Sequence, residues 1–166
     1  MLRQQDERVN ASGAAWLSSA TRDPRATRYV WSIDPGARQP VDTGRIFDAV
    51  VIRANLGAVV LQALIAAQVP LGAVVSASYA DKWAYLVGPG SGDAWRSTVG
   101  PPPAPTRIGW YHYIGPHGCL TVPGPLPHPD TSMRWVARPG LDTNLTCLTS
   151  LARAYLQAVP TAAGPN

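Results

Sequence analysis

The sequence predicts an α+β fold: a single domain with a mixed β-sheet and helices packed on it. The chain has 166 residues, enough for one domain with its own apolar core. Short β-branched runs alternate along it with segments whose apolar residues recur at helical spacing. In residues 44–79 a strand, a helix and a second strand follow one another, and such a crossover predicts two parallel strands.

The domain is expected to span residues 14–160. Residues 1–13 are polar and predict a flexible N-terminal tail, while residues 161–166 predict a frayed C-terminus. A short helix is expected at residues 14–20, ended by Asp23-Pro24. Residues 27–33 alternate aromatic or apolar side chains with other types, which predicts a strand.

The middle of the chain carries the clearest patterns. Residues 44–52 are β-branched and nearly continuous, which indicates a central strand. A helix at residues 58–69 leads to a second strand at residues 73–79. Residues 82–89 predict its hairpin partner, joined through Ala80-Asp81.

The remaining elements are a loop, three strands and a helix. They are expected as a loop at 90–106 with a helical turn at 93–97, strands at 107–115, 118–125 and 132–140, and a helix at 143–159 with Leu145, Leu148, Leu151 and Leu156 facing inward.

Composition limits the protein class. The most apolar stretch, residues 49–75, is broken by polar residues and Pro70, so we expect no membrane span and no membrane partner. Residues 1–13 lack the apolar middle of a secretory signal, which favours a cytoplasmic location. The two cysteines, Cys119 and Cys147, fit no disulfide framework or paired zinc motif and predict buried reduced thiols.

The charged residues are weak evidence for a nucleic-acid partner. The net charge of +4 is compatible with nucleic-acid binding without establishing it. Of the 14 cations 13 are arginine, and nine of the ten acids are aspartate. Together with the many Ala, Gly and Pro residues, this is typical of a high-GC bacterial gene, so the arginines alone do not indicate phosphate recognition.

Three strings carry a resemblance to a known family. They are "FDAVVIRANLG" at residues 47–57, "VPLGAVVSASYADKWAYLVGP" at residues 69–89, and "HGCLTVPGPLPHPDTSMRW" at residues 117–135. The order of elements and these strings resemble the N-terminal domain of bifunctional DNA primase/polymerases (PrimPol-like) of the archaeo-eukaryotic primase superfamily, over residues 44–135. The resemblance implies a primase-polymerase (RRM-like) core. The prolines between Pro123 and Pro129 would then close one side of a nucleotide cleft and protect the sheet edge.

The same resemblance predicts that catalysis is lost. The family carries two aspartates, one residue apart, after the first core strand, where they hold the metals of nucleotidyl transfer. This sequence has Arg53 and Asn55 there. The family's histidine after the second core strand is missing from the turn that contains Asp81, Lys82 and Trp83. Residues 107–121 also contain no acid where the family has a third one.

Asp48 keeps an active enzyme open as an alternative. It lies inside an apolar strand, where an unpaired carboxylate is costly. Asp48 and Asp81 are the candidate catalytic residues of an active DNA primase/polymerase that would use Mg²⁺ or Mn²⁺. The structural interpretation is that Asp48 pairs with Arg45 or Arg28, or caps a backbone group.

Other chemistries have weaker support. His112, His117 and Cys119 lie within eight residues, and His128 or Cys147 could complete a zinc site, but the spacing matches no zinc motif. A His117–Cys119 nucleophile pair lacks a nearby orienting acid. We therefore predict no metal and no cofactor outside the polymerase alternative.

Aromatic residues cluster in the middle third, with cations between them. Such a cluster can form the core or hold single strands and nucleotides by stacking. Its members are Trp83, Trp95, Trp110, Tyr111 and Tyr113, interleaved with Lys82, Arg96 and Arg107.

The predicted function is that of a degenerate, non-catalytic primase/polymerase-like domain, a pseudoenzyme. It would bind a nucleotide, a single-stranded nucleic acid or a protein partner through the former active-site cleft. A second alternative is a small protein-interaction module. The expected nucleotide or nucleic-acid contacts are Arg53, Asn55, Lys82, Trp83, Arg107, His112 and His117.

Overall fold

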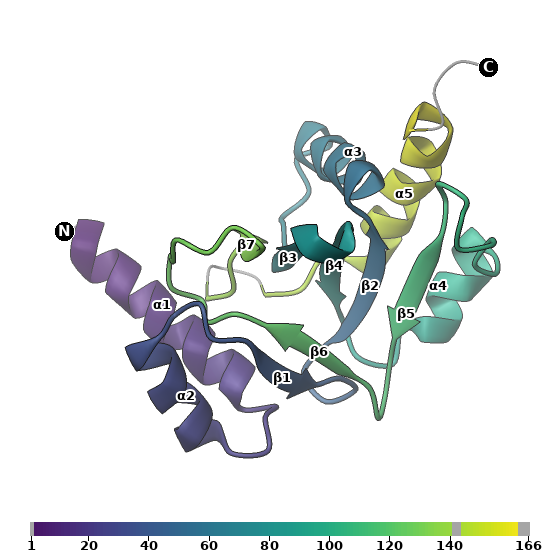
Figure 1. Ribbon diagram of the computed structural model, residues 1–166. Coiled ribbons are helices and arrows are strands. Elements are labelled where there is room, and N and C mark those ends of the chain that lie inside the picture. The colour runs from purple at the N-terminus through teal and green to yellow at the C-terminus, as the bar shows by residue number, and fades with distance from the viewer. Residues whose placement is uncertain (1, 141–143, 163–166) are drawn as a thin grey trace.

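A computed structural model describes residues 2–140 and 144–162 (Figure 1). Their helices are α1 (Leu2–Ser18), α2 (Pro24–Ile33), α3 (Ala54–Ala66), the 3-10 turn η1 (Ser78–Ala80), α4 (Gly92–Val99) and α5 (Leu148–Ala162). Their strands are β1 (Gln39–Asp42), β2 (Asp48–Arg53), β3 (Val74–Ala77), β4 (Lys82–Val87), β5 (Tyr111–Ile114), β6 (Cys119–Val122) and β7 (Met133–Ala137). The α+β class is therefore confirmed.

The strands form a five-stranded sheet in the order β5-β2-β4-β3-β7 and a two-stranded sheet of β1 and β6. Strands β2 and β3 run parallel to each other, as the crossover predicts, but β4 lies between them and pairs antiparallel with both. All pairings between named strands in the described residues are antiparallel. The larger sheet is therefore antiparallel, whereas the sequence predicted a mixed sheet. A parallel contact occurs as an isolated bridge between Val87 and Thr146.

The order β2-α3-β3-β4-α4-β5 is a split β-α-β-β-α-β unit, in which each crossover leaves room for a strand between its ends. It agrees with the RRM-like connectivity expected from the sequence, and β7 adds a fifth strand beyond β3. Many unrelated functions share this connectivity, so the fold alone assigns no activity.

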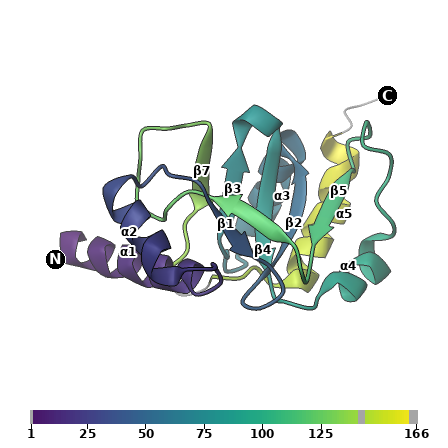
Figure 2. The same cartoon turned by 60° about the horizontal axis from the view of Figure 1, so that its bottom comes forward.

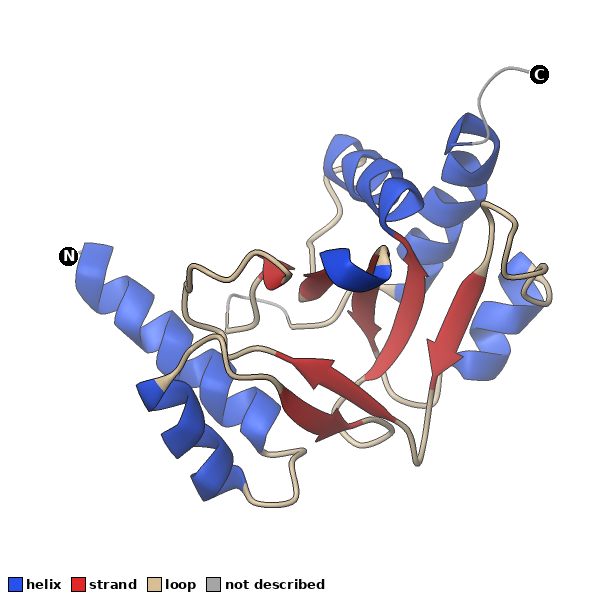
Figure 3. Cartoon of the chain, viewed as in Figure 1, coloured by secondary structure: helices blue, strands red, loops and turns tan. Residues whose placement is uncertain are grey.

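Two apolar clusters lie on opposite faces of the five-stranded sheet. On one face, α3 and α5 pack on residues such as Val50 and Tyr85. On the other, α1, α2 and the β1–β6 ribbon supply Leu17, Trp31 and Val41, which pack with sheet residues of the opposite parity. Figure 3 shows the two helical groups on either side of the strands, and Figure 2 shows the ribbon between α1–α2 and the larger sheet.

The expected N-terminal tail at residues 1–13 is wrong, because all but Met1, which is not described, lie in α1. The short helix expected at residues 14–20 is the end of this longer helix. Helix α1 is mostly polar, so its apolar contacts near Trp16 and Leu17 gave little periodic signal along its length.

The strand expected at residues 27–33 is also wrong, because these residues lie in α2. Asp23-Pro24 starts this helix instead of ending the preceding one: the Asp23 Oδ1 accepts from the backbone N–H groups of Arg25 and Ala26, at 3.1 and 3.0 Å. Pro24 lies in the first turn, where a missing N–H costs nothing. Thr27 and Trp31, one turn apart, are the buried residues of α2.

For the helices after β2, the predicted type of element is correct and the predicted end residues differ from those of the structure. Helix α3 starts four residues before the expected residue 58, and the turn expected at 93–97 is the eight-residue helix α4. Helix α5 begins at Leu148 and includes Thr161 and Ala162, so the frayed end expected at 161–166 is wrong for these two; residues 163–166 lie outside the described residues. Leu156 is 45% exposed rather than inward-facing.

Candidate functional site

A groove of about 340 Å³ lies on the face of the five-stranded sheet opposite α3 and α5. We call it the sheet-face groove. Its lining residues are Val51, Val75, Ala77, Tyr79, Ala80, Lys82, Trp83, Ala84, Trp110, His112, Ile114, Leu120, Thr121 and Met133. They come from all five strands of the larger sheet, from η1, and from β6, which supplies the facing wall.

Strand register explains the apolar floor of the groove. Val51 of β2 lies opposite Ala84 of β4 and His112 of β5, and Ala84 lies opposite Val75 of β3. Residues opposite one another on neighbouring strands point to the same face, so these small side chains and His112 share the face opposite α3 and α5. The valines and alanine leave a shallow hydrophobic floor, with the exposed His112 toward the β5 edge.

Lys82 and Trp110 form the polar end of the groove. The Lys82 Nζ lies 5.0 Å from the centroid of the Trp110 ring, a cation–π arrangement. Lys82 begins β4 and Trp110 precedes β5, on opposite sides of β2, and both side chains line the groove. Trp110 belongs to the aromatic cluster singled out in the sequence, but the local pattern did not separate it from the core aromatics.

Arg53 and Asp81 close the same end of the sheet. Arg53 pairs in register with Lys82, and the backbone N–H of Ala54 donates to the Asp81 carbonyl at 3.1 Å. The Arg53 guanidinium lies 3.6 Å from the Asp81 carboxylate and donates to the Pro105 carbonyl at 2.6 Å. Arg53 thus ties the proline-rich loop to the sheet, while its buried Nε has no hydrogen-bond partner.

Two other predicted contacts lie near this end and line no part of the groove. Asn55 is exposed in the first turn of α3, and its side-chain oxygen accepts from the Leu56 N–H at 2.8 Å. Arg107 is exposed in the loop before β5, where its carbonyl accepts from the Trp110 N–H at 3.0 Å. The loop geometry at Arg107 therefore helps to place Trp110.

Trp83 reaches the groove only at its margin. Its ring packs on α3, since a Cβ built on Gly57 would lie 2.9 Å from that ring. Gly57 is thus the residue that lets β4 and α3 approach closely at this point. Trp83 therefore packs in the helical layer and does not present a free stacking surface.

Asp48 lies at the far end of β2 from Asp81. It pairs with Val87, whereas Asp81 precedes Lys82, the register partner of Arg53. Five residue steps along β2 span about 17 Å. The structure does not bring the two candidate catalytic carboxylates together, and two bridging metals need ligands around a separation of about 4 Å.

The partners of Asp48 are neither of the expected arginines. Its Oδ2 accepts from the Gly90 N–H at 2.8 Å and from the Tyr113 hydroxyl at 2.7 Å. Arg28 instead donates to the Ser18 hydroxyl at 2.9 Å. Burial, together with the Asp48 carboxylate, raises the pKa of Tyr113, so this hydroxyl stays protonated as a donor.

His117 and the two thiols lie outside the sheet-face groove. His117 is in the exposed turn after β5, with a positive φ of 66°, and lines a separate hollow with Arg45. Cys119 and Cys147 are both exposed, so the expectation of buried thiols is wrong. Hydrogen bonds from the backbone N–H and hydroxyl of Ser150 lower the pKa of the Cys147 thiol.

The aromatic cluster divides between the core and the groove. Trp95 of α4, Tyr111 of β5 and Tyr155 of α5 form an edge-to-face triad in the core, with ring centroids 5.4 to 6.1 Å apart. Trp110 lines the groove, and Tyr113 binds Asp48.

The prolines between Pro123 and Pro129 do not line the sheet-face groove, so they do not close one side of it as expected from the sequence. Pro125 and Pro127 line a different hollow, beside β7. The groove wall comes instead from Leu120 and Thr121 of β6.

Within residues 2–140 and 144–162, no three His, Cys, Asp or Glu side chains are grouped so that they could hold a metal ion. No helix in that part of the chain has the length and apolar character needed to cross a membrane.

Comparison of the chain with protein-family models, curated proteins and solved structures gives no match.

Proposed function

We propose that this chain is a primase-polymerase-like domain without nucleotidyl-transfer activity, which binds a nucleotide or a short single-stranded nucleic acid in the sheet-face groove. The observation that carries the proposal is the cation–π pair of Lys82 and Trp110 beside His112, in a groove on one face of a split β-α-β-β-α-β sheet. Open sheet faces that combine aromatic rings with cations hold single strands by stacking and charge attraction.

Different residues of the groove would contact the base and the phosphate of a bound nucleotide. The floor of Val51, Ala84 and Val75 is apolar but almost fully buried, so a base would find its main contact area on the half-buried ring of Trp110. Lys82 supplies positive charge for a phosphate at the same end. Arg53 is already bound to Asp81 and Pro105, so it contributes mainly by fixing that end.

The loss of catalysis is supported by the positions of the acids. Asp48 is enclosed by Gly90 and Tyr113, and Asp81 is bound to Arg53 at the opposite end of β2. A phosphoryl-transfer site needs hard oxygen ligands gathered around its metals. An active polymerase is therefore the weaker interpretation. The cytoplasmic location and a protein partner remain predictions from the sequence.

Fluorescence anisotropy with a labelled oligothymidylate, and thermal shift with ATP and dNTPs, each with and without Mn²⁺, test the proposal. We expect saturable binding that does not depend on metal. Lys82→Ala and Trp110→Ala should each weaken it about tenfold, because one stacked base or one lost charge contact contributes about 1–3 kcal/mol. Arg25→Ala, at an exposed position on α2, is the matched control.

The other outcomes are equally informative. Binding or primer synthesis that requires Mn²⁺ and is lost in Asp48→Ala would revive the polymerase. The absence of binding to every probe would leave the interaction-module interpretation. Equal losses in the Lys82 and Arg25 variants would mean that binding reflects net charge rather than the groove.

A further inference from the structure

Strand β7 is an edge of the five-stranded sheet, because it pairs with β3 on one side and with no strand on the other in the described residues. An edge strand directs alternate N–H and C=O groups outward, where another extended chain can pair with them. The pairing of β7 with β3 is irregular between Val74 and Val75, so the strand also bends there.

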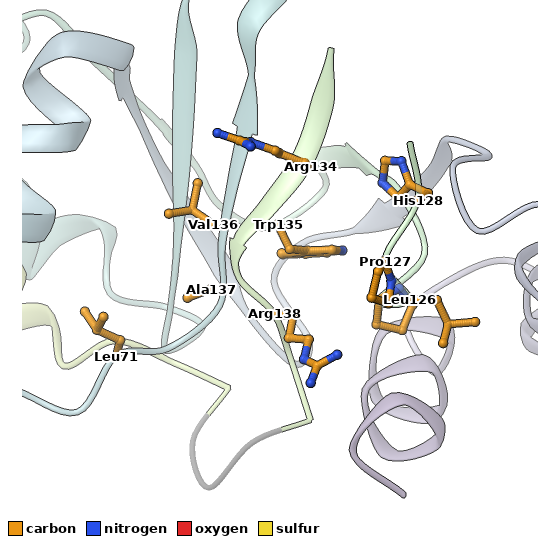
Figure 4. A pocket seen from close by; sticks show the side chains of 10 residues that line it. Leu71, Leu126, Pro127, His128, Arg134, Trp135, Val136, Ala137 and Arg138 are labelled. Atoms are coloured by element: carbon orange, nitrogen blue, oxygen red, sulfur yellow. The ribbon is translucent and has the colours of Figure 1, made fainter. Parts of the chain in front are cut away.

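A hollow of about 540 Å³ runs along this outer edge. Figure 4 shows β7 on one side of the hollow, the segment with Pro127 and His128 on the other, and Trp135 between them. Its lining residues are Leu71, Pro125, Leu126, Pro127, His128, Arg134, Trp135, Val136, Ala137 and Arg138. We call it the β7-edge hollow.

The opposite wall forms no strand pair with β7 in the described residues. Proline has no backbone N–H, and residues 123, 125, 127 and 129 are all proline, so alternate positions of this segment lack a donor. Trp135 also sets the spacing: its Nε1 donates to the carbonyls of Pro123 and Gly124 at 3.2 and 3.1 Å. The indole thus holds the proline segment beside β7, whose outer edge pairs with no strand in the described residues.

The charge of the hollow is positive. Arg134 is exposed, Arg138 lies at the other end, and none of the lining residues is acidic. Arg138 is partly neutralised, because it donates to Asp6 at 2.7 Å and to Asn10 at 3.1 Å. Arg134 therefore provides the main charge for a partner strand.

The symmetric pairing of two copies centred on Val136, the middle of the Arg134–Arg138 segment, is unfavourable. Two β7 strands paired antiparallel about a two-fold axis at Val136 would place Arg134 of each copy opposite Arg138 of the other. Like charges opposite each other destabilise a strand pair. A strand with acidic side chains would be attracted by the same arginines.

We propose that the outer edge of β7 is a docking site for an extended acidic segment of a partner polypeptide, which adds to the sheet as a further strand. Main-chain hydrogen bonds to β7 would supply sequence-independent affinity, and Arg134 would select acidic side chains on its face of the sheet. This site lies on a different surface from the sheet-face groove and does not depend on the function proposed for that groove.

The test uses the whole chain and a synthetic nonapeptide of alternating valine and glutamate at millimolar concentration, followed by backbone-amide NMR. We expect shifts concentrated at residues 134–138 and slowed exchange of outward amides there. Arg134→Glu should weaken binding about tenfold, which corresponds to about 1.4 kcal/mol. Arg25→Glu makes the same charge change on α2 and should leave binding unchanged.

Three further peptides separate the pairing from the charge. Two of them carry methyl groups on alternate backbone nitrogens, in the two possible registers, which keeps every side chain and removes the donors of one edge; one of these two should fail to bind if a strand is added. Replacement of glutamate by lysine should weaken binding at least as much as Arg134→Glu does. Absence of binding, binding that survives both N-methylated registers, or concentration-dependent dimerisation through β7 would each overturn the proposal.

Discussion

At the scale of single residues, the fully buried carboxylate of Asp48 is the group that most needs hydrogen-bond donors. Its Oδ2 has two donors, the Gly90 N–H and the Tyr113 hydroxyl, whereas its buried Oδ1 has no partner in the structure. A strand that buries an acid among apolar residues therefore depends on both donors. Asp48 thus joins β2 to β5 and to the glycine-rich turn before α4.

Removal of one donor should be costly. Tyr113→Phe is expected to lower the free energy of unfolding by about 1–3 kcal/mol, because it leaves a buried acceptor with one donor fewer. Urea denaturation measures the loss. The control is Tyr29→Phe, since Tyr29 is 67% exposed and should show almost no change. Equal effects of the two variants would contradict a special role for the Tyr113–Asp48 bond.

The phenol of Tyr155 gives the protein a specific alkaline sensitivity. Burial raises its pKa from 10.0 to about 12, and its hydroxyl donates to the Gly109 carbonyl. The folded state therefore holds this proton more tightly than the unfolded state. The resulting stabilisation is fully present below pH 10.0 and is lost as the pH rises toward about 12.

The corresponding prediction concerns how steeply the free energy of unfolding changes with pH. Between pH 10.0 and about 12, the unfolding free energy of Tyr155→Phe should fall less steeply than that of the unmodified chain, because one titrating group is gone. Urea denaturation across this range, with tyrosinate absorbance as a second readout, measures the difference. Parallel curves for the two proteins would show that Tyr155 does not titrate with folding.

At the scale of secondary-structure elements, the N-cap at Asp23 fixes where α2 begins. Asp23→Ala removes the side chain that accepts from the N–H groups of Arg25 and Ala26. We expect it to lower stability by about 0.5–2 kcal/mol, the usual effect of losing an N-cap. Asp23→Asn keeps a capping oxygen and should retain most of the stability in thermal unfolding. A loss in Asn as large as in Ala would argue against capping.

Elements with a strong apolar pattern were predictable from the sequence, and those without one were not. Strands β2, β3 and β4 and helix α3 each carry an apolar pattern of the matching period, and all four were expected close to their places. Residues 27–33 fit two periods at once. The structure chooses the helical one: Trp31 is 1% exposed, whereas Tyr29 and Ile33 are each 67% exposed.

At the scale of the whole molecule, the candidate site was predictable only where strand register alone determines it. The hairpin of β3 and β4 beside β2 places Lys82 against Arg53, and both were named from the sequence. The Lys82–Trp110 contact depends on β5 pairing with β2 across a long loop, which no local pattern encodes. The proline segment likewise takes its place from long-range contacts of Trp135.

The N-terminal helix is also a property of the whole molecule, because α1 has little apolar pattern of its own and is fixed by what it covers. Leu17 is 0% exposed, and the Trp16 and Phe47 rings lie 5.8 Å apart. The turn after β7 approaches the same helix so closely that a Cβ at Gly140 would collide with the Val9 carbonyl oxygen. Helix α1 is therefore part of the second apolar cluster.

This arrangement gives a prediction opposite to that of a flexible tail. Leu17→Ala should lower the free energy of unfolding by about 2–5 kcal/mol, because it opens a cavity in a packed core. The matched control is Leu156→Ala on α5, where the leucine is 45% exposed and the loss should be much smaller. Urea denaturation of both variants makes the comparison. If the Leu17 variant were as stable as the unmodified chain, α1 would not belong to the core, and the apolar cluster that contains Val41 and Phe47 would need another cover.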